Sequence, residues 1–99
     1  MDSLRFQGID TRAHLQLAED LLPEDPQHAS DLLDQAISHD RYNEALYRAA
    51  MHTRHALGDH DGIRNLLRAL TRALADLSAE PSDNTAELAN KLRDSLNQR

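Results

Sequence analysis

The segment Ala-Ser-Asp-Leu-Leu-Asp-Gln-Ala-Ile, residues 29–37, decides the fold class. Its apolar residues Ala29, Leu33 and Ala36 follow the spacing of one face of an α-helix. The same spacing returns 34 residues later, at Ile63, Leu67 and Leu70. A period of 34 residues is typical of tetratricopeptide (TPR) helix pairs. The first copy has the small-large-small order that lets paired helices approach closely. The second copy replaces both alanines, so we expect TPR-like packing with a looser match to the pattern in the second pair.

Working outward from this segment, helix breakers divide the whole chain into helical stretches. Asp25 before Pro26 predicts an N-cap and a first-turn proline, and Gly58 predicts a helix end. Asp59 or Asp61 can cap the following helix, and Asn84 with Glu87 resembles a capping box. The chain has no Val and no alternating strand pattern. Five helices are therefore expected, at about residues 10–22, 26–39, 43–57, 60–77 and 84–97.

These helices predict an all-α fold in a single domain, residues 1–99. Short loops favour antiparallel neighbours, so we expect a TPR-like antiparallel stack. The last helix has only a narrow apolar stripe of Leu88, Leu92 and Leu96, which is typical of a helix that caps a repeat stack.

Composition excludes several functional classes. The chain has 99 residues, a net charge of −6 and no cysteine, so thiol catalysis and Cys-ligated zinc are excluded. Its eleven dispersed basic residues argue against direct nucleic-acid binding, which depends on clustered Lys and Arg. No membrane span or signal peptide is visible, so a cytoplasmic location is expected. No catalytic motif appears, and we expect no enzyme activity, cofactor or small-molecule substrate.

A family resemblance rests on several segments between about residues 25 and 93. They are Ala29-x-x-Leu32-Leu33-x-x-Ala36-Ile37, Asn43-Glu44-Ala45-Leu46-Tyr47-Arg48-Ala49-Ala50-Met51, Ala56-Leu57-Gly58-Asp59, and Glu80-Pro81-Ser82 with Thr85. In this order they resemble the bacterial transcriptional activator domain, the TPR-like domain of actinobacterial antibiotic-regulatory activators. The chain departs from that family at Arg41, where a Pro is common, and at Leu66 and Leu67, where an aromatic residue is common.

The resemblance implies self-association and regulation rather than chemistry. Family members usually carry a winged-helix DNA-binding domain, which is absent from this sequence. We therefore expect a protein-interaction or oligomerisation module of a transcriptional regulator, without its own DNA-binding domain. The alternatives are a free-standing TPR-like adaptor and a metal-responsive sensor.

One polar helix face is the candidate partner-binding site. Arg48, His52 and His55 lie at positions i, i+4 and i+7 of one helix and share a face, and His14 maps onto Arg48 through the 34-residue offset. In TPR proteins the first helix of each pair lines the concave groove. These four residues are therefore candidates for binding an acidic or C-terminal peptide, and an ordinary solvated helix face is the alternative.

Two further possibilities remain open. His52 and His55, near His60, Asp59 and Asp61, provide donor types that bind zinc or nickel, although no HExxH pattern supports a metal. Phe6, Ile9 and Leu96 are candidates for contact with a second copy, which would give a homodimer.

Overall fold

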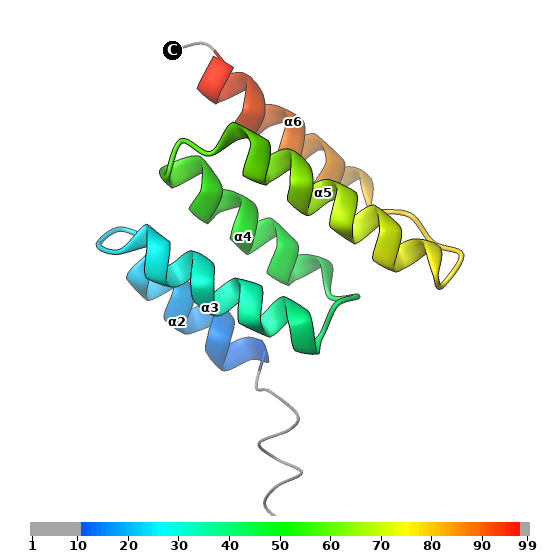
Figure 1. The fold of residues 1–99 in the computed structure, drawn as a ribbon, viewed down its shortest axis with the longest axis horizontal. Coiled ribbons are helices and arrows are strands. Elements are labelled where there is room, and N and C mark those ends of the chain that lie inside the picture. The colour runs from blue at the N-terminus through cyan, green and yellow to red at the C-terminus, as the bar shows by residue number, and fades with distance from the viewer. Residues whose placement is uncertain (1–10, 98–99) are drawn as a thin grey trace, which may run out of the picture.

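The computed structural model describes residues 11–97 of the chain, and within them it contains five α-helices and no strand. The helices are α2 (Thr11–Leu21), α3 (Pro26–His39), α4 (Glu44–Ala56), α5 (His60–Ala75) and α6 (Asp83–Asn97) (Figure 1). The predicted all-α class is confirmed. The helix bounds differ from the predicted ones by at most two residues.

Side-chain caps fix where α3, α4 and α5 begin. The Asp25 side chain accepts a hydrogen bond from the His28 N–H at 3.1 Å, with Pro26 in the first turn. The Asn43 side chain accepts one from the Ala45 N–H at 3.1 Å. Asp59, rather than Asp61, caps α5. Each cap satisfies one of the backbone donors that a helix start leaves unpaired.

Two helices end in the same backbone motif but with different residues. Gly58 follows α4 with φ +71°, and the Asp59 N–H reaches back to the Arg54 carbonyl at 2.8 Å. After α5, Ser78 takes the same position with φ +56°, and the Ala79 N–H reaches the Leu74 carbonyl at 2.9 Å. Both are Schellman-type ends, but only the first uses the residue that adopts this conformation without strain.

Two details of the predicted helix pattern are wrong. The Asn84–Glu87 capping box is not formed, because α6 begins one residue earlier and Ser82 occupies the cap, its carbonyl accepting the Thr85 N–H at 3.1 Å. Leu77, the last residue of the predicted helix 60–77, is 55% exposed. It lies in the turn that follows α5, where the chain has already left the helix face that packs on the core.

The helices form a linear stack of hairpins. Sequential neighbours contact one another from α2 to α6, and α4 also contacts α2 and α6, so α4 is the one described helix that touches all the others. In Figure 1, α2 lies behind α3 and α6 lies behind α5, with α4 between the two pairs. The side of the molecule behind α3 and α5 is thus made by α2, α4 and α6.

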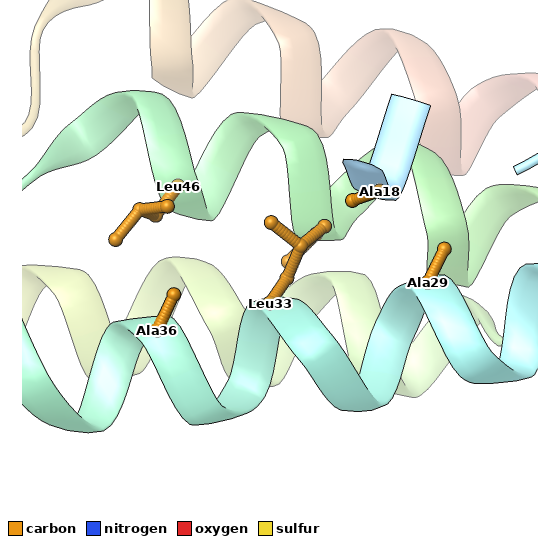
Figure 2. Close-up of a cluster of buried hydrophobic side chains, with 6 residues drawn as sticks. Ala18, Ala29, Leu33, Ala36 and Leu46 are labelled. Atoms are coloured by element: carbon orange, nitrogen blue, oxygen red, sulfur yellow. The ribbon is translucent and has the colours of Figure 1, made fainter. Parts of the chain in front are cut away.

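The core is continuous but differs in residue size along the stack. Around α3 it consists of Ala18, Ala29, Leu33, Ala36, Leu46 and Ala50 (Figure 2). Leu33 projects towards α4 between small residues, so the helices come close. Around α6 it consists of Met51, Ile63, Ala89 and Leu92, with half-buried leucines beside them. Ile63 and Leu70 are fully buried. They take the positions that Ala29 and Ala36 have in the first copy, so the core of the second copy is filled by larger side chains.

None of the helices between residues 11 and 97 has the length and apolar character that crossing a membrane requires.

Candidate partner-binding face

The predicted binding residues all lie on helices of the side formed by α2, α4 and α6, which we call the α2–α4–α6 face. His14 is half-buried on α2, and Arg48, His52 and His55 lie on α4. The structure does not gather the four into one cluster. It divides the three residues of α4 between the α2 side and the α6 side of that helix.

His52 lies on the α2 side, at a small hollow of about 100 Å³. The hollow is lined mainly by apolar atoms of α2, α3 and α4, and its lining residues are Ala18, Glu19, Leu22, Leu33, Ala49, His52 and Thr53. The Thr53 hydroxyl is already used, because it donates to the Ala50 carbonyl at 2.6 Å. The other lining residues with polar side chains are Glu19 and His52.

The setting of His52 favours its neutral form. Partial burial lowers the pKa of the ring below its ordinary value of 6.5, and the neighbouring His55 lowers it further. Removal of a charged imidazole from water disfavours protonation. At neutral pH His52 is therefore an uncharged group with one donor and one acceptor nitrogen.

Arg48, on the same outer face of α4, points towards α6, where it forms part of a polar network. Its Nη1 donates to the Thr85 hydroxyl at 2.9 Å and lies 4.0 Å from Glu44 Oε1. The Thr85 hydroxyl in turn donates to Glu44 Oε1 at 2.8 Å. Because Thr85 is fully buried and its bonds to Arg48 and Glu44 are partly buried, this chain of hydrogen bonds joins the first turns of α4 and α6.

Glu44 also supplies the missing half of a helix cap. Its Oε1 accepts from the Ser82 backbone N–H at 3.0 Å and from the Ser82 hydroxyl at 3.1 Å. In a capping box a glutamate of the same helix accepts from that N–H, whereas here the carboxylate comes from α4. A negative charge at this point also complements the positive end of the α6 dipole.

Hydrogen bonding decides the charge state of Glu44. Burial raises the pKa of its carboxyl group, but the bonds from Ser82 and Thr85, together with the Arg48 charge, outweigh burial and lower that pKa below 4.5. The carboxylate is therefore ionised wherever the protein is folded near neutral pH.

His55 adds a second contact to α6. Its Nε2 lies 3.2 Å from the Ser95 hydroxyl, at the other end of α6. Thus Arg48 and His55 face α6, and only His52 faces the hollow next to α2.

No sequence pattern predicts the network around Glu44. Glu44 lies 38 residues before Ser82 and 41 residues before Thr85, and local spacing rules do not pair residues so far apart. In the sequence, Glu44 resembles an ordinary acidic first-turn residue, since such residues are favoured by the helix dipole alone.

Of the three candidates for self-association, one lies within the described residues. Phe6 and Ile9 lie outside the described residues. Leu96 is half-buried against the cluster of Met51, Ile63, Ala89 and Leu92. Its role in contact with a second copy stays a prediction.

The histidines are not grouped with other ligand types in the described part of the chain. Within residues 11–97, no group of three or more His, Asp or Glu side chains is arranged to hold a metal ion. His60 lies next to Asp61, with Nδ1 3.8 Å from the carboxylate.

Comparisons with known proteins identify no relative: no protein-family model matches the chain, and neither does any curated protein or solved structure.

Proposed function

We propose that the chain is a cytoplasmic, TPR-like protein-interaction module of a bacterial transcriptional regulator, and that its partner binds the α2–α4–α6 face. The apolar hollow beside His52 is the observation that carries this proposal. It opens between the first helices of two successive hairpins, where the stacked helices leave a shallow depression that a peptide can enter.

The size of the hollow indicates what enters it. A cavity of about 150 Å³ holds a benzene molecule, so a volume of about 100 Å³ suits one aliphatic side chain. The apolar lining provides the affinity, since about 0.8 kcal/mol is gained for each buried methylene group. Glu19 and His52 at the hollow provide hydrogen-bonding groups for the backbone of the bound peptide.

The network around Arg48 indicates which chemical type of partner this face can bind. Arg48 already donates to the Thr85 hydroxyl at 2.9 Å and lies 4.0 Å from the Glu44 carboxylate. That carboxylate balances part of the Arg48 charge and repels a second acidic group placed beside it. An apolar anchor residue next to α2 therefore fits the face better than a carboxylate next to Arg48.

Two sequence observations support the regulatory setting. The segments from Ala29 to Thr85 resemble the bacterial transcriptional activator domain in composition and order. The net charge of −6 disfavours contact with phosphates, so DNA recognition falls to another segment or another protein. The module's own task is then contact between proteins.

Selection of peptides from a displayed random library against residues 1–99 tests the proposed site. We expect the enriched peptides to share one aliphatic anchor. We expect Ala49→Leu, which fills the hollow, to weaken their binding at least tenfold. Ala56→Leu is the matched control, because Ala56 is an exposed residue at the end of the same helix. Equal binding by both variants in titration calorimetry would exclude the hollow as the site.

Binding should also depend on pH. A peptide that covers His52 removes more water from the ring and favours its neutral form further. We therefore expect weaker binding at about pH 5.5 than at about pH 8, since histidine protonates in this interval. Equal affinities at the two pH values would contradict the contact with His52.

A further inference from the structure

The outer face of α5 carries a stripe of positive charge that the proposed site does not use. Arg64, Arg68 and Arg72 recur every four residues, which places them in one row along the helix. Arg64 is paired with Asp61 at 3.0 Å. Arg68 and Arg72 are exposed, and neither forms an ion pair with another residue of the described segment. Like charges four residues apart disfavour a helix slightly, so helix stability does not account for the row.

A shallow hollow of about 430 Å³ extends this row towards the turn between α3 and α4. Arg72 and Arg41 flank it, and Ala69 and Ala73 are among its lining residues. Arg41 is fixed by its bond to Asp76 at 3.1 Å, and the Tyr47 hydroxyl fixes the turn by donating to the Arg41 carbonyl at 2.8 Å. The hollow therefore presents the Arg72 guanidinium, unpaired within the described segment, beside small side chains, whereas the charge of Arg41 is balanced by Asp76.

The opposite end of the molecule carries the complementary charge. Residues 11–40, which include α2 and α3, contain seven acidic residues and one basic residue, a net charge of −6. Helix α5, residues 60–75, contains three basic residues and one acidic residue, a net charge of +2. Neither α2 nor α3 contacts α5, so the acidic hairpin and the arginine row of one copy are separated by α4 (Figure 1).

We propose that the row of Arg68 and Arg72 on α5 is the docking site for the acidic α2–α3 hairpin of a second copy of this chain. The inference goes beyond the proposed function, because it assigns a second binding surface to the chain. Complementary fields of this kind steer association and fix the orientation of the two copies. Exposed carboxylates of the hairpin, such as Glu24 and Asp31, supply bidentate acceptors for the guanidinium groups.

This contact joins two different surfaces, so it is heterologous. Each copy in a pair still has one free hairpin and one free arginine row, and the assembly grows unless it closes into a ring. Since the interacting charges are exposed, screening weakens the contact when the Debye length falls from about 30 Å at 0.01 M salt to about 3 Å at 1 M salt. Self-association through an apolar contact at Leu96 would not show this loss.

Sedimentation velocity over a range of concentrations at low salt tests the proposal. We expect wild-type mass to rise with concentration and to return to that of the monomer at high salt. Arg72→Glu should raise the dissociation constant at least tenfold. Lys91→Glu, an equal charge change at an exposed position of α6, should leave it unchanged. A wild-type chain that stays monomeric at low salt, or equal effects of the two variants, would overturn the proposal.

A mixing experiment tests whether the two surfaces bind each other. Arg68→Glu/Arg72→Glu and Glu24→Lys/Asp31→Lys should each be monomeric when alone, because each lacks one half of the contact. Mixed in equal amounts, they should form dimers, since the first variant retains the hairpin and the second retains the arginine row. Two folded variants, verified by circular dichroism, that stay monomeric in the mixture would contradict the pairing. Neither variant alters the hollow beside His52, so peptide binding there succeeds or fails independently.

Discussion

The two sides of α4 are joined to the rest of the molecule in opposite ways. Towards α2 and α3 the core contacts are small and apolar, with Leu33 between alanines and a hollow left beside His52. The Arg54–Asp34 ion pair at 3.0 Å adds a polar contact there, near the surface. Towards α6 the apolar contacts of Met51 and Leu92 are accompanied by a partly buried hydrogen-bond network centred on Glu44 and Thr85. The difference indicates a division of roles, in which one side leaves room for a partner and the other fixes the terminal helix in a single orientation.

Leu33→Ala should cause the largest loss of stability. Leu33 is fully buried where α2, α3 and α4 meet, so its truncation loses apolar burial and leaves a cavity, at a cost of about 2–5 kcal/mol. Urea denaturation followed by circular dichroism measures the change. Leu17→Ala, at a residue of α2 that is 48% exposed, should change the unfolding free energy little. If the two substitutions had similar effects, the apolar packing of α4 against α2 and α3 would not depend on Leu33.

Thr85→Val should weaken the polar contact between α4 and α6. The substitution keeps the side-chain shape but leaves Glu44 and Arg48 without their shared hydroxyl, which we expect to cost about 1–3 kcal/mol. Hydrogen exchange should show faster exchange in α6 than in the wild type, with α3 unchanged. Thr71→Val is the control, because that exposed hydroxyl donates only to the Leu67 carbonyl of its own helix. Uniformly faster exchange in all helices would show that the network does not act locally.

Glu44→Gln should show a smaller, pH-dependent effect of about 1 kcal/mol near neutral pH. Since folding lowers the pKa of Glu44 from 4.5, its ionised form stabilises the protein fully above that value. The benefit is lost as pH falls through the folded-state pKa. The difference in unfolding free energy between wild type and variant should therefore disappear at acidic pH. A difference that stays constant from neutral to acidic pH would show that the charge of Glu44 does not stabilise the contact between α4 and α6.

Ser78→Gly should have the smallest effect, and it should increase stability. Ser78 holds φ +56° at the end of α5, and glycine adopts this conformation more easily, by about 0.5–1 kcal/mol. Gly58→Ala is the converse test. Gly58 has φ +71°, and a Cβ atom added there would meet no other atom within 4 Å, so only backbone strain should destabilise the variant. Thermal unfolding of both variants would show opposite shifts. A loss of stability in Ser78→Gly would mean that the serine side chain stabilises this turn.

The sequence predicts the features that depend on neighbours along the chain. Asp25 with Pro26, Asp59 and Gly58 each act on backbone groups within a few residues, so their residue types suffice to place the helix ends. Ala29, Leu33 and Ala36 mark the buried face because helical period alone places them together. Leu77 is the exception, because Ser78, an unusual residue for a left-handed turn, gives no signal of the helix end.

The candidate site depends on distant contacts, and the sequence predicts it only in part. Helical spacing correctly places Arg48, His52 and His55 on one helix, but it cannot show that two of them face α6. That outcome depends on how closely α4 approaches each neighbour, and hence on packing. The arginine row of α5 is visible in the sequence as single residues, but its significance depends on the charge at the other end of the fold.

The central position of α4 also has a consequence for how the chain folds. Apart from its contacts with α2 and α6, every helix contact joins sequential neighbours. Such local topology favours folding on the order of microseconds to milliseconds. Helices α2, α3 and α4 contain all the buried residues of the Leu33 cluster, and α5 adds only the partly buried Leu66. During synthesis they can therefore pack as soon as α4 has emerged from the ribosome, before α6 has been made.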